Sequence, residues 1–292
     1  MSQVLEELLT LLDPERIEEN LFRGQSQDLG FKALFGGQVL GQALAAATRT
    51  VPEERIPHSL HGYFLRPGDA SLPVVYAVDR VRDGGSFSTR NVSAVQKGQT
   101  IFTAMASFQT SEGGFSHQEP TMPDVPPPDA LTDEQVLWER HAHRIPAPVR
   151  ERLIGEKPIE MRPVVLVDPF EPEVLPPVRQ VWFRARGTLP QSPHVHRELL
   201  AYASDYSLLG TALLPHGRTF ASPGLQMASI DHALWLHGEI RFDDWLLYDM
   251  DSPWAGNGRG LCRGRIFSRE GQLLASSAQE GLIRQRPISP HN

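Results

Sequence analysis

The chain has 292 residues, with 28 lysines and arginines against 35 aspartates and glutamates, which gives a net charge of −7. Because binding to nucleic acid needs a basic surface, this balance argues against a nucleic-acid partner. No stretch is long and apolar enough to predict insertion into a membrane. A single cysteine, Cys262, rules out an intrachain disulfide. The length predicts one large domain or two of ordinary size.

The N-terminal stretch MSQVLEELLTLLDPERIEEN alternates apolar and acidic residues. It lacks the basic start and the small-residue cleavage site of a secretory signal. The final residues, PISPHN, differ from the Ser-Lys-Leu tail of a peroxisomal protein. We therefore expect a soluble protein with a cytoplasmic location.

The first half of the chain shows the pattern of one helix followed by an antiparallel sheet. Residues 36–48, GGQVLGQALAAAT, begin with two glycines and place apolar residues at helical spacing. Four strand-like stretches follow, separated by turns such as RDGG and QKG, and they span residues 59–66, 73–81, 86–95 and 99–109. Short turns between alternating stretches predict an antiparallel meander.

Residues 115–177 differ in composition from the stretches on either side. They hold 13 of the 25 prolines and contain one predicted helix, TDEQVLWERHAH at 132–143. We interpret this stretch as an interdomain linker that is ordered against its neighbours, because long structureless loops are uncommon in compact domains. The predicted domains are therefore residues 1–114 and 178–292.

The second half repeats the order of the first. A predicted helix at 199–214 precedes four strand-like stretches at 227–238, 244–251, 258–268 and 271–285. The offset between matching stretches is about 170 residues, and Gly98-Gln99 and Gly271-Gln272 open corresponding last strands. This repetition predicts a tandem duplication of one helix-plus-sheet unit.

One residue of the second predicted helix conflicts with its surroundings. Asp205 lies in LLAYASDYSLLGTALL, and no lysine or arginine stands within four positions of it. An ionised carboxylate on an apolar helix face is costly unless something compensates it. A partly buried carboxylate has a raised pKa and is a competent general base, which makes Asp205 a candidate catalytic residue.

Six ordered stretches carry a family resemblance. They read LFGGQVLGQAL, HSLHGYFLRPGD, RDGGSFSTRNVSAVQ, YASDYSLL, ASIDHALWLH and ASSAQEG. Together they resemble acyl-CoA thioesterase II, a bacterial family with peroxisomal relatives, and the match runs from about residue 8 to residue 285. The resemblance implies an α+β fold of two tandem hotdogs, each a long helix wrapped by a curved antiparallel sheet. It also implies hydrolysis of medium- and long-chain acyl-CoA to fatty acid and CoA, as in fatty acid metabolism.

The resemblance further implies a catalytic aspartate, threonine and glutamine, all from the second hotdog. Asp205 and Gln279 stand at two of these positions, and Ser229 stands where the family usually has threonine. On this interpretation Asp205 takes a proton from a water molecule that Ser229 and Gln279 hold. We expect no metal and no cofactor, because CoA is part of the substrate.

Further residues are candidates for contacts with the substrate. Gly36 and Gly37 open the first predicted helix, and the free N–H groups and positive dipole end of a helix N-terminus suit an oxyanion. The phosphates of CoA need cations, for which Lys32, Arg66 and Arg90 are the candidates. We expect the acyl chain in an apolar tunnel between helix and sheet.

Other polar patterns favour structural roles. Asp231 and His232 are neighbours on a predicted strand, so their side chains face opposite sides of the sheet and do not share one site. The pairs HAH (141–143) and HVH (194–196) suit solvated surface better than metal. The serine-hydrolase elbow Gly-x-Ser-x-Gly and the phosphate-binding loop are both absent.

A comparison of the two halves predicts one active site per chain. Ser59 matches Ser229 in the repeat, but Ala106 stands near the position of Gln279, and no acid matches Asp205. Two alternatives stay open: a hotdog enoyl-CoA hydratase or dehydratase, which needs an aspartate and a histidine in one site, and a non-catalytic acyl-CoA-binding protein. We also expect a homo-oligomer, either a dimer or a tetramer.

Overall fold

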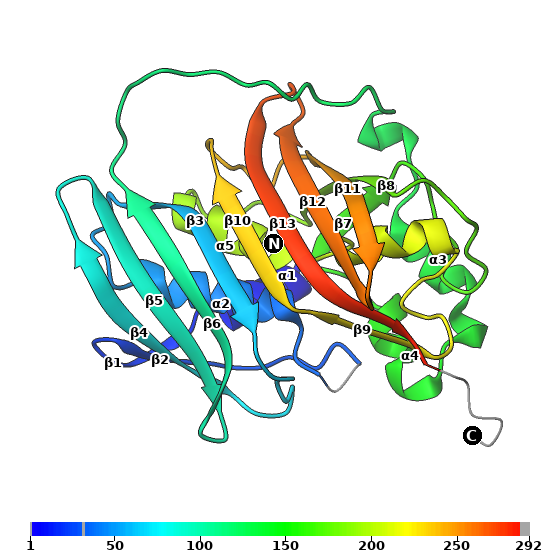
Figure 1. The fold of residues 1–292 in the computed structure, drawn as a ribbon, viewed down its shortest axis with the longest axis horizontal. Coiled ribbons are helices and arrows are strands. Elements are labelled where there is room, and N and C mark those ends of the chain that lie inside the picture. Colours follow the sequence, from blue (N-terminus) through cyan, green and yellow to red (C-terminus); the bar gives the residue numbers. More distant parts are fainter. Residues whose placement is uncertain (1, 31–32, 287–292) are drawn as a thin grey trace.

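A computed structural model describes residues 2–30 and 33–286 of the chain (Figure 1). The first half follows the predicted order of helix and strands. Its elements are α1 (Gln3–Leu12), β1 (Glu15–Glu18), β2 (Leu21–Gly24), α2 (Gly36–Thr48), β3 (Ile56–Phe64), β4 (Val74–Asp83), β5 (Phe87–Gln96) and β6 (Gln99–Gln109). The helix predicted at 36–48 is confirmed as α2, and the four predicted strands are β3 to β6.

The second half contains the same kinds of element in the same order. They are β8 (Val178–Ala185), α5 (Pro193–Ala203), the 3₁₀ helix η3 (Leu209–His216), β9 (Leu225–Ser229), β10 (Asp231–Leu236), β11 (Leu246–Gly256), β12 (Arg259–Ser268) and β13 (Leu273–Gln285). The last three predicted strands are β11 to β13. The tandem hotdog fold is therefore confirmed.

The single helix predicted at 199–214 is wrong. α5 ends at Ala203, Ser207 has a left-handed backbone with φ of 64°, and the chain resumes as η3. Asp205 lies in the turn between the two helices. The apolar spacing concealed the break because the leucines and alanines of both helices are buried on either side of it.

The strand predicted at 227–238 is divided at Ile230. The N–H of Ile230 donates to the carbonyl of Glu280 in β13, whereas its own carbonyl accepts from Phe64 in β3. β9 therefore pairs with β13, while β10 pairs with both β13 and β3. This change of direction places Ser229, the last residue of β9, at the boundary between the two halves.

The strands of the two halves belong to one antiparallel sheet with the order β1-β2-β4-β5-β6-β3-β10-β13-β12-β11-β8, and β9 pairs with β13 beside this path. The halves join where β3 meets β10, with His61 opposite Ala233. α2 and α5 pack against each other on one face of the sheet, called here the inner face (Figure 1). Gly37 and Gly41 permit this close contact, because a Cβ on Gly37 would lie 2.2 Å from the carbonyl oxygen of Tyr202.

The stretch predicted to be a linker contains η1 (Pro128–Ala130), α3 (Glu134–Arg140), η2 (Ala142–Arg144), α4 (Ala147–Ile154) and β7 (Ile159–Pro163). β7 pairs with β8 and so extends the sheet of the second half. The segment before α3 crosses the opposite, outer face, where Met122, Val125 and Leu131 pack against an apolar cluster that includes Trp182 and Trp245. These parts of the stretch thus pack against the second half.

No described helix has the length and apolar character needed to cross a membrane.

Candidate active site

The three residues predicted to be catalytic lie together. Asp205 follows α5, Ser229 ends β9, and Gln279 lies on the inner face of β13. The Nε2 of Gln279 is 2.7 Å from Oδ1 of Asp205 and 3.1 Å from Oγ of Ser229. The Oγ of Ser229 is 3.5 Å from the same Oδ1. A carboxylate, a hydroxyl and an amide thus form a compact polar cluster beside an apolar core.

No lysine or arginine of the described chain forms an ion pair with Asp205. Burial therefore raises the pKa of its carboxyl group above the ordinary value. Three hydrogen bonds oppose this shift, from the amide of Gln279, the backbone N–H of Gly37 and the hydroxyl of Ser229. The result is a carboxylate that is partly desolvated, held in place, and more basic than an exposed aspartate.

The N-terminus of α2 approaches Asp205 from the first half. A Cβ on Gly36 would lie 2.7 Å from Oδ2 of Asp205, so only glycine permits this distance. The backbone N–H of Gly37 donates to Asp205, which corrects the prediction that it is free to bind an oxyanion. The N–H of Gly36 lies one residue earlier at the same helix end and remains the candidate oxyanion donor.

Aromatic side chains surround this cluster. Phe35 stacks on Tyr206 with ring centroids 4.9 Å apart and meets Tyr202 edge-on at 5.2 Å. The hydroxyls of Tyr202 and Tyr206 are 3.0 Å apart. The ring of Phe64 lies beside Gly36. The carboxylate therefore lies at the meeting point of both halves, in surroundings that exclude much of the solvent.

One contact of the candidate site, between His232 and Gln279, was missed in the sequence. His232 and Asp231 do face opposite sides of the sheet, as predicted: His232 is buried, while Asp231 accepts a hydrogen bond from the backbone N–H of Glu280. However, Nδ1 of His232 lies 3.2 Å from Nε2 of Gln279, directly behind the cluster. The signal was the alternation of side chains along a strand. His232 in β10 and Gln279 in β13 both stand at positions whose side chains face the inner face of the sheet, and the two strands are neighbours.

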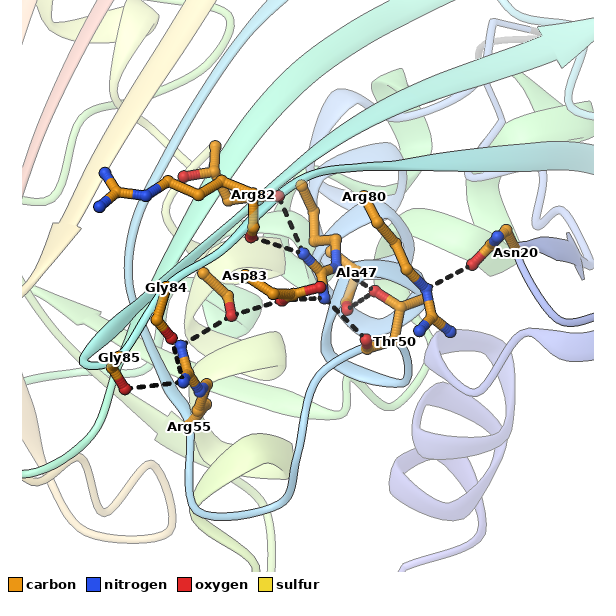
Figure 2. Close-up of polar contacts among 12 residues, drawn as sticks. Asn20, Ala47, Thr50, Arg55, Arg80, Arg82, Asp83, Gly84 and Gly85 are labelled. Atoms are coloured by element: carbon orange, nitrogen blue, oxygen red, sulfur yellow. Dashed lines mark hydrogen bonds and ion pairs between the residues drawn. The ribbon is translucent and has the colours of Figure 1, made fainter.

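Arg90 does not fit the predicted role of a phosphate contact. It is 1% exposed, and its guanidinium donates to Oγ1 and the carbonyl of Thr50, to the carbonyl of Arg82 and to Asp83. Figure 2 labels these three acceptor residues. All of its nitrogens are therefore committed inside the first half. Arg66 is exposed and donates to the carbonyl of Thr100, so it remains a candidate, and Lys32 lies outside the described residues.

The predicted match between Ser59 and Ser229 is also wrong. Ser59 pairs with Trp235, which is 38% exposed on the outer face, whereas Ser229 faces Asp205 on the inner side. The pairing of β3 with β6 has a register shift between residues 57 and 59. The first half therefore lacks the hydroxyl as well as the acid.

No group of three or more His, Cys, Asp or Glu side chains suited to a metal ion occurs in residues 2–30 and 33–286. Of the histidine pairs predicted to be solvated, His143 is exposed and His141 lies 2.7 Å from Asp168. His196 is instead 2% exposed and accepts the N–H of Phe242 through Nδ1. It is buried because it lies on the inner side of α5.

Two family models match the chain. One described as acyl-CoA thioesterase matches residues 148–282, and one described as acyl-CoA thioesterase N-terminal domain matches residues 25–109. Acyl-CoA thioesterase 2 of Haemophilus influenzae is 45% identical over 284 residues, which cover 97% of this chain and 99% of that protein. Acyl-coenzyme A thioesterase 8 of Homo sapiens is 42% identical over 285 residues, covering 95% and 89%.

Solved structures agree with these relatives. The crystal structure of the acyl-CoA thioesterase II TesB2 from Mycobacterium marinum is similar with a TM-score of 0.78 and 45% identity, covering 97% of this chain and 98% of that one. The dehydratase domain of RzxB from Pseudomonas fluorescens has a TM-score of 0.52 and 12% identity, covering 94% and 99%. The second likeness shows a shared fold alone.

Proposed function

The chain belongs to the acyl-CoA thioesterase family and hydrolyses acyl-CoA thioesters, and from this premise we propose that Asp205 activates the attacking water. The observation that carries the proposal is the contact of one carboxylate with both Gln279 and Ser229, at 2.7 and 3.5 Å. A base needs to be desolvated enough to accept a proton and fixed enough to aim the water. Asp205 meets both conditions.

The reaction has two steps. Asp205 accepts a proton from water as the water oxygen attacks the thioester carbonyl, and the resulting oxyanion forms near the N–H of Gly36 at the start of α2. The tetrahedral intermediate then collapses, breaks the carbon–sulfur bond, and releases the CoA thiolate and a fatty acid. The proton on Asp205 leaves to solvent or to the thiolate. Ser229 and Gln279 orient the water throughout.

The pH dependence of kcat/KM tests the base. Because burial raises the pKa of Asp205, activity on the acid side should be lost at a higher pH than the pKa of an ordinary aspartate predicts. The Gln279→Ala variant lacks a hydrogen bond that lowers this pKa, so its acid limb should move further toward neutral pH. An acid limb at the same pH in both proteins would contradict the assignment of Asp205.

The alternative functions make different demands on the site. A hydratase needs an aspartate and a histidine that act on one substrate, but His232 lies behind Gln279 and both of its nitrogens contact protein groups. A non-catalytic acyl-CoA-binding protein has no use for a desolvated base. Incubation with palmitoyl-CoA and a thiol reagent separates the three, because only hydrolysis releases free thiol.

Four finer properties complete the proposal. We propose a preference for medium to long acyl chains, no required cofactor, a homo-oligomer (dimer or tetramer) and a cytoplasmic location. The family resemblance supports the chain length, and a mechanism that needs only a carboxylate, a hydroxyl and an amide supports independence from a cofactor. Measurements of kcat/KM from butyryl-CoA to stearoyl-CoA, with and without a chelator, test the first two. Sedimentation analysis tests the assembly.

A further inference from the structure

Asp205 favours one orientation of the Gln279 amide, and a second buried neighbour, His232, favours the same orientation. Gln279 is fully buried, and its Oε1 has no hydrogen-bond partner among the described residues. Its Nε2 has two N–H groups and three neighbouring acceptors, on Asp205, Ser229 and His232. A rotation of the amide by 180° would place Oε1 at the 2.7 Å position beside the Asp205 carboxylate, where two acceptors repel each other.

The contacts of the His232 ring determine which of its nitrogens donates a hydrogen bond and which accepts one. Its ring is 1% exposed and lies between two polar groups, with Nε2 2.9 Å from Oγ of Ser204 and Nδ1 3.2 Å from Nε2 of Gln279. The hydroxyl of Ser204 donates its one proton to the carbonyl of Ala201, at 2.9 Å. Toward His232, Ser204 is therefore an acceptor, so Nε2 carries the ring proton.

This assignment leaves Nδ1 of His232 as an acceptor. The chain then runs in one direction: Gln279 N–H donates to His232, the Nε2–H of His232 donates to Ser204, and Ser204 donates to the last turn of α5. Burial lowers the pKa of His232 to about 3, so the ring stays neutral throughout the working pH range. In this tautomer Nδ1 can accept a hydrogen bond from the N–H of Gln279. It cannot bond to the amide oxygen of Gln279, because both atoms are acceptors.

We propose that His232 is a positioning residue, which holds the Gln279 amide with its nitrogen toward Asp205 and its unpartnered oxygen toward the reacting water. The free Oε1 then accepts a hydrogen bond from the water while Asp205 takes the other proton. The inference rests on the water mechanism proposed above. His232 touches neither substrate nor water, and it acts through Gln279.

Three substitutions of His232 separate positioning from packing. His232→Asn keeps an acceptor near the position of Nδ1 and should retain most of the activity. His232→Gln reaches the position of Nε2 but loses the acceptor for Gln279, and His232→Leu loses both contacts. For these two variants we expect kcat to fall roughly 10- to 100-fold with KM little changed, the effect of one misplaced hydrogen bond in the transition state.

His196→Asn is the matched control, because His196 is also buried in the second half and also accepts through Nδ1, but from the backbone of Phe242. It should change the melting temperature and leave kcat unchanged. If His232→Leu and His232→Asn lose kcat equally, or if both keep wild-type kcat when folded, the positioning role is overturned. Asp205→Asn distinguishes the two proposals: full activity there would refute the water mechanism itself, whatever His232 does.

Nitrogen NMR of the labelled enzyme reads the tautomer directly. We expect the His232 ring to show a neutral Nε2–H form whose shifts do not change between about pH 5 and pH 9. In Ser204→Ala the ring should become a mixture of tautomers, because the acceptor that selects Nε2–H is gone. An Nδ1–H tautomer in the wild type, or a titration within this range, would overturn the inference.

Discussion

The two halves of the chain place different groups at equivalent positions, just beyond the end of the central helix and beside the last strand of the half. In the second half Asp205 follows α5 and contacts Gln279 of β13. In the first half Thr50 follows α2, Ala106 stands on β6, and Arg90 donates from Nε to Oγ1 of Thr50 at 2.8 Å. The first half therefore has a guanidinium beside the residue that follows its helix, where the second half has the amide of Gln279 beside Asp205.

The strand register supports this equivalence. Arg90 lies opposite Ala106 across β5 and β6, and Cys262 lies opposite Gln279 across β12 and β13. A small buried cysteine beside Gln279 thus corresponds to a large buried arginine beside Ala106. The same scaffold therefore holds either a cluster of a carboxylate and an amide or a buried guanidinium, according to which side chains fill these positions.

The opposite end of the helix pair shows a second difference. A hollow of about 400 Å³ lies between α1, α2 and α5, with Asp13, Arg49 and Glu198 in its lining. Asp13 and Arg49 form an ion pair, whereas burial raises the pKa of Glu198 to about 8. This end has carboxylates too, but the hydroxyl of Thr10, which lines the same hollow as Glu198, donates to the carbonyl of Glu6.

The largest effect should follow removal of the acid. Asp205→Asn keeps the shape of the side chain, and we expect kcat to fall by roughly 10²–10⁴, the usual contribution of a positioned base. Melting should shift upward at neutral pH, because the variant no longer buries a charge that prefers water. Asp231→Asn, on the adjacent strand and turned away from the cluster, is the control and should keep its turnover. Turnover close to that of the wild type in Asp205→Asn would remove Asp205 from the role of the base.

The substitution Arg90→Met should affect stability alone. It leaves the carbonyls of Thr50 and Arg82 without a buried donor, so we expect the free energy of unfolding to fall by about 2–3 kcal/mol. Steady-state assays of the folded variant should give unchanged kcat and KM. Arg82→Met, exposed on the neighbouring strand, should lie within about 0.5 kcal/mol of wild type in denaturant unfolding. A raised KM for acyl-CoA in Arg90→Met would restore Arg90 as a substrate contact.

Substitutions of Ser229 should have a smaller effect. Ser229→Thr keeps the hydroxyl in a stiffer side chain and should retain most activity. Ser229→Ala should lose transition-state stabilisation of roughly 1–3 kcal/mol, the cost of a hydrogen bond left unmade. Measurement of kcat/KM for both variants shows whether the hydroxyl of residue 229 is needed. Equal losses would show that the hydroxyl contributes nothing and that the size of the side chain matters instead.

The smallest effect should appear in the pH dependence of stability. The folded-state pKa of Glu198, about 8, lies above its ordinary value of 4.5, so the folded state binds this proton more tightly than the unfolded state. The contribution of Glu198 to the free energy of unfolding is therefore at its full value below about pH 4.5, and it decreases as the pH rises to about 8. Glu198→Gln should flatten this decline in thermal melts from pH 5 to pH 9, without changing kcat. An unchanged slope would place Glu198 in solvent.

The sequence predicted the parts of the molecule that depend on local patterns. Helix α2 and the strands β3 to β6 followed from apolar spacing and turns, whereas the grouping of Asp205, Ser229 and Gln279 was implied by the family resemblance. The break before η3 followed from neither, because the left-handed Ser207 interrupts the backbone without interrupting the apolar pattern. Tertiary packing overrides local spacing at such positions.

The partners of buried polar groups were equally invisible in the sequence. The role of Arg90 depends on Thr50, 40 residues away along the chain, and that of His232 on Ser204 and Gln279. Charge and residue type alone suggested a phosphate contact for Arg90. Only the three-dimensional arrangement shows that every nitrogen of its guanidinium already has an acceptor.

A single turnover in ¹⁸O-labelled water, with enzyme in excess and mass spectrometry of both products and peptides, tests the central claim most directly. If Asp205 activates water for direct attack, one ¹⁸O should enter the fatty acid. The peptides that contain Asp205 and Ser229 should then carry neither label nor acyl group. An ¹⁸O atom in the Asp205 peptide, or an acyl adduct on the Ser229 peptide that forms and decays at the rate of turnover, would contradict the account.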